Sequence, residues 1–303
     1  GLFGVAGTFM PNAAAIFADR FLLGAATAAI MSAGVALITV FFQGEKQLKM
    51  IALQGMSMEL GGVIFLSISG MLAGFSWRYP FFIYALGFVA FFMLLLFVPK
   101  CGKAEEEVQD TQDSFQQQGV PVWLVLLIAF FGMLMFFTAM VSLPIYLQND
   151  LGYSPSFTGY YLAVLDLVAV LAAGVMPKIV AKIHEKNCLV IAFFCYGAAF
   201  LIYFLSGHIA ALGAAVLLAG AGFGLSTPLF NSLVVRKSTP KNKGTNISLC
   251  TMAMFLGQFL SALLVSGFSG KKMFLAAVVI SWIAGMSILP VTKMYERKDS
   301  QSR

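Results

Sequence analysis

Nine apolar runs, each about as long as a helix that crosses a bilayer, follow one another along the chain. A membrane-spanning helix needs about 20 mostly apolar residues. The runs are 21–42, 51–75, 77–98, 122–147, 156–176, 188–206, 209–235, 247–268 and 274–292. Because 60% of the residues are hydrophobic and only 11% are charged, the chain lacks the polar surface of a soluble protein of this size. The runs therefore predict an integral membrane protein.

The pattern within the runs predicts helices rather than strands. Strands of a membrane barrel are about ten residues long and alternate in polarity, whereas these runs are continuously apolar. The opening segment 1–9 is apolar but too short to cross a bilayer, so we interpret it as the end of a tenth span. We expect an all-α integral membrane bundle with nine or ten helices present.

The basic residues give the orientation. Of the 19 Lys and Arg residues, only Arg20, Arg78, Lys271 and Lys272 fall on one side of the predicted spans. The side that collects the excess is predicted to be cytoplasmic. We expect an N-terminal half at 1–98, a cytoplasmic linker at 99–121, a C-terminal half at 122–295 and a cytoplasmic tail at 296–303. The expected location is the plasma (inner) membrane.

Several classes of function are disfavoured by residue patterns. The basic residues are scattered between apolar runs and form no face for nucleic acid. The four cysteines show no metal-binding spacing, and His184 and His208 lie in loops on opposite sides. The intramembrane serines have no histidine or lysine beside them for nucleophilic catalysis, and no glycine-rich loop could hold a phosphate. We predict neither an enzyme nor a resident metal or cofactor.

A weak internal repeat relates the two halves. Residues 21–25 resemble 217–221, and 58–61 resemble 254–257. Each half places its two matching glycines 37 positions apart, although chance similarity in apolar sequence is an alternative explanation. If the repeat is real, three spans precede residue 209 in the second half but only a stub precedes residue 21. We then expect an intact protein of twelve spans, of which this chain lacks the first two and part of the third.

Short motifs lie along almost the whole chain. The longest is Leu143 to Gln148 followed by Leu151 to Gly159, and others are at 20–24, 77–82, 222–231 and 255–261. These motifs resemble the major facilitator superfamily, and specifically its twelve-span drug/proton antiporter-like branch. The longest motif is the most specific match and is similar to the family's connection between its seventh and eighth helices. The resemblance implies a bundle of two helical halves that moves a small molecule by alternating access.

The sequence departs from the family pattern at two motifs. Phe65 and Leu66 stand where the antiporter signature has a Gly-Pro pair, and Lys178 replaces an acidic residue of a gate motif. We expect proton-coupled efflux of drug-like or amphipathic compounds. The alternatives are an uncoupled or symporting facilitator of a small metabolite or sugar and, in another class, a non-transporting membrane sensor. The expected partners are a small-molecule substrate and the lipid bilayer but no nucleic acid, and we expect a monomer.

Ionisable residues within the spans are candidates for proton coupling. Each costs about 2.5–3.5 kcal/mol to insert, so it needs a partner or a function. Asp166 and Glu59 are the candidate proton carriers, since removal from water favours the protonated acid. The resemblance implies that Arg20 occupies the position of a coupling arginine. The alternatives are packing for Glu59, a hydrated cavity for Asp166 and an interfacial position for Arg20, with Asp19 as its partner.

Substrate contacts are expected from the helices that line the family's central cavity. On the resemblance, Phe137 and Tyr146 on the seventh helix and Asn231 on the tenth are candidates, and Gln258 in mid-span is a further one. The alternative for Gln258 is a hydrogen bond between helices, and most Phe and Met residues are expected to pack or face lipid. The glycines between 213 and 224 are expected either to let helices pack closely or to let them bend.

Overall fold

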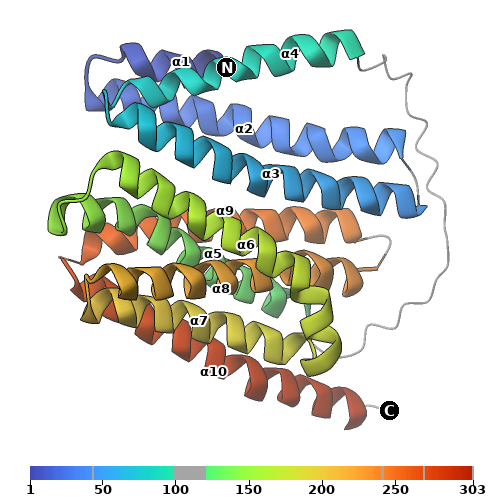
Figure 1. Cartoon of the computed structure of the whole chain (residues 1–303). Helices are drawn as coiled ribbons and strands as arrows, with labels where there is room; N and C mark the ends of the chain where they lie inside the picture. Colours follow the sequence, from blue (N-terminus) through green and yellow to red (C-terminus); the bar gives the residue numbers. More distant parts are fainter. Residues whose placement is uncertain (43, 98–120, 240–241, 269, 302–303) are drawn as a thin grey trace. The chain divides into compact units, whose positions relative to one another are not determined.

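The computed structural model describes residues 1–42, 44–97, 121–239, 242–268 and 270–301. All regular elements in these ranges are helices (Figure 1). The chain divides into two compact units, which consist of Gly1–Gln109 with Ser154–Ala163, and of Asp110–Tyr153 with Val164–Arg303. Nearly all of the predicted linker at 99–121 lies outside the described residues.

The predicted membrane spans are confirmed. Nine helices in the described part of the chain are long and apolar enough to cross a bilayer. One difference is at the first span, where the helix begins at Ala13 and not at residue 21. The Asn12 side chain caps it by accepting a hydrogen bond from the Ala15 N–H at 2.8 Å. The helix therefore includes Asp19 and Arg20, which the apolar run had excluded because they are charged.

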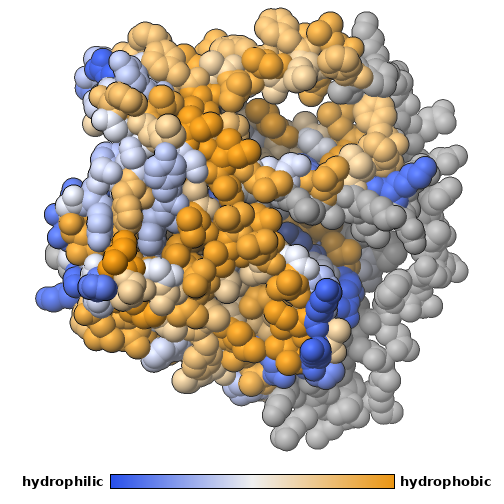
Figure 2. Space-filling view, viewed as in Figure 1, coloured by the Kyte–Doolittle hydropathy of each residue, from blue (hydrophilic) through white to orange (hydrophobic). Residues whose placement is uncertain are grey.

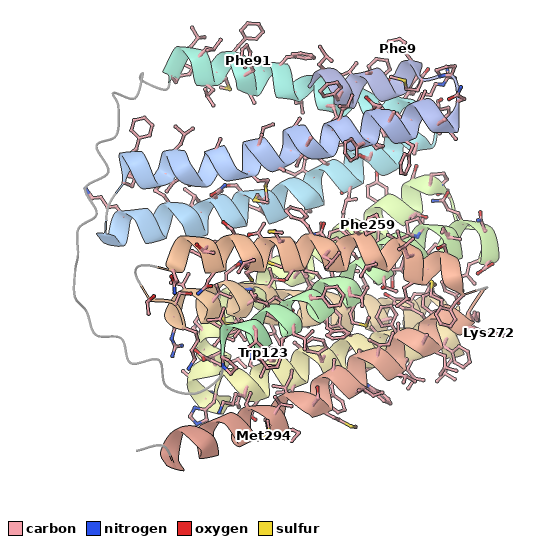
Figure 3. All side chains as sticks on the ribbon, turned by 180° about the vertical axis from the view of Figure 1, so that it is seen from behind. Phe9, Phe91, Trp123, Phe259, Lys272 and Met294 are labelled. Atoms are coloured by element: carbon pink, nitrogen blue, oxygen red, sulfur yellow. The ribbon has the colours of Figure 1, made fainter. Side chains whose placement is uncertain are left out.

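The first unit combines long helices with short helical segments. Its elements are α1 (Leu2–Ala6), η1 (Gly7–Phe9), α2 (Ala13–Phe41), α3 (Gly44–Ala73), η2 (Tyr79–Ala85) and α4 (Leu86–Phe97). The short segments α1 and η1 pack against η2, which also contacts α3. Much of this unit's apolar surface is exposed, and Phe9 and Phe91 project from it with 72% and 54% of their surface accessible (Figure 3). Such side chains suit a lipid environment.

The second unit has a buried core. It contains α5 (Val122–Ile145), η3 (Tyr146–Asp150), most of α6 (Pro155–Ile183), α7 (Glu185–Leu205), α8 (Ile209–Arg236), α9 (Lys243–Gly267) and α10 (Lys272–Gln301). The helices pair as α5 with α9 and α8, and α7 with α8 and α10. Because α10 runs to Gln301, the segment predicted as a tail from residue 296 is helical almost to its end.

Glycines allow the helices of the second unit to approach closely. A Cβ atom at Gly224 would overlap the carbonyl oxygen of Ala169 on α6, and one at Gly257 would overlap the carbonyl oxygen of Phe130 on α5. Gly213 on α8 differs, because a Cβ atom at that position would have nothing within 4 Å among the described residues. Close packing therefore accounts for Gly224 but not for every glycine of the predicted cluster.

The flanks and the ends of the helices differ in polarity at the surface. Figure 2 shows hydrophobic residues over most of the visible helix flanks, with hydrophilic residues toward the ends. Among the exposed large apolar residues are Leu171 on α6, Leu217 on α8 and Ile283 on α10. An apolar flank between polar ends matches the profile of a bilayer, so the flanks are the lipid-facing surface.

Candidate functional site

A charged pair lies inside the first unit. Arg20 Nη2 and Nε both donate to Oδ2 of the neighbouring Asp19, at 2.6 and 3.2 Å. Nη2 also donates to the Phe3 carbonyl oxygen on α1 at 3.4 Å. The side chain of Asp19 is only 2% exposed and that of Arg20 is 30% exposed. Arg20 therefore makes specific contacts within the first unit.

Aromatic rings complete the environment of the Arg20 guanidinium. Its central carbon lies 5.0 Å from the ring centre of Phe81 and 5.7 Å from that of Tyr84, both on η2. The negative face of an aromatic ring attracts such a cation, and more strongly where water is excluded. Gly7 makes room for the arrangement, since a Cβ there would collide with Arg20 Nη2. Four segments of the first unit thus meet at one guanidinium.

The second oxygen of Asp19 is unsatisfied. Asp19 Oδ1 is buried with no hydrogen-bond partner among the described residues, and the same holds for the hydroxyl of Thr8 on η1. A buried acceptor without a donor costs about 1–3 kcal/mol, and more for a charged group. The carboxylate is consequently held by Arg20 on one oxygen only. Sequence reasoning treated Asp19 only as an interfacial partner, whereas the Asn12 cap was the signal that placed it within the helix.

The two predicted proton carriers lie in different units. Asp166 is buried on α6, with 6% of its surface exposed. It is next to Leu165, whose carbonyl oxygen packs against Gly220 of α8. Glu59 lies on α3, and its side chain is outside the described ones. The coupling roles of Asp166, Glu59 and Arg20 stay predictions.

The predicted substrate residues lie in unlike surroundings. Phe137 is half-buried beside Phe136, and Asn231 is exposed on α8. Gln258 is half-buried on α9, directly after the glycine that touches α5. Tyr146 is 2% exposed and packs edge-on against Phe274, with the Lys271 ammonium 5.5 Å from its ring centre. Tyr146 thus lies in the packed interior of the second unit, while Asn231 is the most accessible of the four.

Comparison with protein families gives the classification. Residues 1–262 match the family model "Major Facilitator Superfamily". The chain belongs to this superfamily. Because the family consists of transporters, the predictions of a transporter and not an enzyme, and of secondary transport across a membrane, are confirmed.

Solved structures show the same fold for this superfamily member. Twenty-six chains match significantly. One of them is a bacterial homolog of the human lysosomal transporter Spinster, in an inward-facing and occupied conformation, with a TM-score of 0.70 at 17% identity. The match covers 98% of this chain and 81% of that one. No curated protein sequence matches significantly.

Proposed function

We propose that this superfamily member is a proton-coupled transporter that exports drug-like or amphipathic small molecules by alternating access. The observation that carries the proposal is the Asp19–Arg20 pair, in which a buried carboxylate has one oxygen on the guanidinium and the other without a donor among the described residues. The resemblance of residues 20–24 to the antiporter pattern supports it further. A charged side chain within a membrane span costs free energy to insert, so its presence there points to a functional role.

The pair suggests how a proton changes the first unit. Arg20 stays charged at all physiological pH values. When a proton adds to Asp19, the carboxyl group loses its charge and its attraction for the guanidinium. Arg20 is then held mainly by the Phe3 carbonyl and by the rings of Phe81 and Tyr84. Protonation thereby shifts the balance of contacts between α2 and η2, and this change is the coupling step that we propose.

Asp166 and Glu59 complete the proposed proton pathway. Asp166 is buried on α6 in the second unit. Glu59 occupies the span Leu53–Ala73 of the first unit. With one proton carrier in each unit, proton movement would depend on the conformation of both units. The proposed energy source is the proton gradient.

The chemistry of the chain supports an apolar, adaptable substrate site. The sequence contains 30 Phe and 16 Met residues, and flexible thioethers and aromatic rings suit ligands of varied shape. We assign substrate contacts to Phe137, Asn231 and Gln258, with Tyr146 as a supporting residue. In the proposed orientation the linker and the C-terminus face the cytoplasm of a plasma membrane.

Proton coupling is tested by flux in proteoliposomes. With ethidium as probe, an imposed pH gradient should drive transport by the wild type, and Asp166→Asn and Glu59→Gln should each lower the gradient-driven rate by roughly tenfold or more. Asp150→Asn is the matched control, because Asp150 is exposed at the end of η3 and should keep the wild-type rate.

The outcomes separate the alternatives. Transport that ignores the gradient would overturn proton coupling and favour the uncoupled facilitator. Gradient-driven transport that persists in both variants would leave coupling intact but remove Asp166 and Glu59 from it.

A further inference from the structure

One membrane span of the first unit begins in an unusual helical form. The span Tyr79–Phe97 consists of the 3-10 helix η2 and the α-helix α4, which follows it without a loop. A 3-10 helix is rarely longer than three or four residues, but η2 has seven. Its bonds are of the 3-10 type at both ends, because the Phe81 N–H donates to the Arg78 carbonyl and the Leu86 N–H donates to the Ile83 carbonyl. A long 3-10 stretch often marks a hinge or a strained segment, so some contact must hold η2 in this form.

That contact is with the Arg20 guanidinium of α2. Phe81 and Tyr84 are three residues apart on η2, and their ring centres lie 5.0 and 5.7 Å from the central carbon of the guanidinium. In a 3-10 helix, two residues three apart lie directly above one another, with a separation of about 6 Å along the axis. Two rings arranged in this way can both face one cation. In an α-helix the same residues differ by about 60° around the axis, so the two rings could not both keep this position.

Two glycines give the rings room beside Arg20. Gly4 on α1 and Gly7 on η1 are also three residues apart, and both segments pack against η2. A Cβ atom at Gly4 would collide with the ring of Tyr84, and one at Gly7 would come within 3.0 Å of the ring of Phe81. Each ring is therefore confined by a glycine as well as by the guanidinium.

A change of η2 to an α-helix would move α4. Per residue, a 3-10 helix rises about 0.5 Å more and turns about 20° more than an α-helix. Over the seven residues of η2 the difference is about 3.5 Å in length and about 140° in rotation. Since α4 continues directly from η2, it would shift and turn with it. In either form the span is close in length to the bilayer core, which is about 30 Å thick.

We propose that η2 is a conformational switch, which the Arg20 guanidinium holds in the 3-10 form through Phe81 and Tyr84. When the guanidinium leaves this position, η2 changes to the α-helical form and shifts α4. Phe81 and Tyr84 are positioning residues, since they act through Arg20. The part of this switch in transport rests on the proposed coupling role of the Asp19–Arg20 pair, and η2 is the element that responds to that pair.

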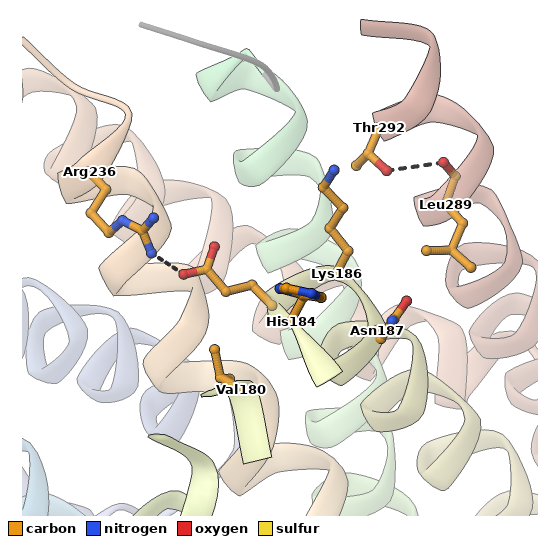
Figure 4. Close-up of a pocket in the computed structure, with 8 residues that line it drawn as sticks. Val180, His184, Lys186, Asn187, Arg236, Leu289 and Thr292 are labelled. Carbon is orange, nitrogen blue, oxygen red and sulfur yellow. Dashed lines mark hydrogen bonds and ion pairs between the residues drawn. The ribbon is translucent and has the colours of Figure 1, made fainter. Parts of the chain in front are cut away.

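A second ion pair provides a matched comparison. Arg236 Nη1, at the end of α8, donates to Glu185 Oε1 of α7, as the dashed line in Figure 4 marks. This pair belongs to the second unit, and the Arg236 side chain is 61% exposed, whereas that of Arg20 is 30% exposed. Removing it eliminates one acidic and one basic charge, as removing Asp19–Arg20 does, but leaves η2 its guanidinium.

The test is the distance between α2 and α4 in the full chain, measured by pulsed electron paramagnetic resonance in lipid nanodiscs. Nitroxide labels are attached at Phe17→Cys on α2 and Leu96→Cys on α4, which are 77% and 78% exposed, after the four native cysteines are replaced by alanine. In Asp19→Asn combined with Arg20→Gln, this distance should shift by roughly 3 Å or more. No buried charge is left unpaired in that variant, so it should still fold.

Two further measurements separate the switch from a general disturbance. Glu185→Gln combined with Arg236→Gln should keep the wild-type distance. Fluorinated phenylalanines at Phe81 change the size of the ring little, but each fluorine weakens the attraction of the ring face for a cation. With one, two and three fluorines, the shifted fraction of molecules should rise in steps, to about fivefold above the wild type. The same series at Phe82, which is 46% exposed on η2, should leave the fraction unchanged.

The outcomes distinguish the switch from the transport proposal. An unshifted distance in the Asp19→Asn, Arg20→Gln variant, equal shifts in the two double variants, or the same response to fluorine at Phe81 and Phe82 would each overturn the switch. Transport that ignores the pH gradient would overturn proton coupling and would leave the distance change as it is.

Discussion

Replacing Arg20 with Gln should abolish gradient-driven transport and also destabilise the protein. The change leaves the Asp19 carboxylate buried without its partner, which typically costs about 3–5 kcal/mol. We expect a large loss of thermal stability in detergent and a gradient-driven ethidium flux that is roughly tenfold or more below the wild type.

A second variant separates the two effects of that change. In Asp19→Asn combined with Arg20→Gln, no buried charge is left unpaired, so thermal stability should recover while gradient-driven flux stays lost. Arg78→Gln is the matched control, since Arg78 is exposed and stacks on Trp77, at 5.0 Å from the ring centre. Recovery of flux together with stability in the double variant would show that the pair is structural and takes no part in coupling.

Gly224→Ala should cost about 1–3 kcal/mol of stability, the usual range for overpacking. The new methyl group would overlap the Ala169 carbonyl oxygen of α6. That atom belongs to backbone, which cannot move aside as a flexible side chain can, so α6 and α8 must separate. Thermal unfolding in detergent micelles should show a clear drop in the transition temperature.

Gly213→Ala provides the internal comparison on the same helix. Within the described part of the chain, nothing lies within 4 Å of a Cβ at Gly213, and alanine favours a helix over glycine by up to about 1 kcal/mol. Its transition temperature should stay at or above that of the wild type. Equal losses in the two variants would contradict the close α6–α8 contact.

Much of the fold was predictable because membrane helices are a local property of sequence. Each run of about 20 apolar residues must form its backbone hydrogen bonds internally, whatever its neighbours are. The span predicted at 209–235 accordingly corresponds to α8, Ile209–Arg236. The first span was misplaced at its start, because the charged residues Asp19 and Arg20 interrupted the apolar run while the Asn12 cap began the helix before them.

The candidate site was only partly predictable. Arg20 was identified from its motif, but the rings that hold it lie on η2, some sixty residues later. Tyr146 was assigned to a cavity on the resemblance, whereas its ring packs against Phe274 in the interior of the second unit. The sequence therefore identified Arg20 and Tyr146 as candidates but did not show which side chains surround each of them.

The sequence alone determined that this protein is an all-helical membrane bundle of nine described spans, because lipid leaves a continuous apolar chain no other way to satisfy its backbone. Only the tertiary structure decided which polar side chains face the protein. That depends on how each helix is rotated about its axis, and contacts such as Gly224 against Ala169 or Arg20 against Phe81 set this rotation between residues far apart in the chain.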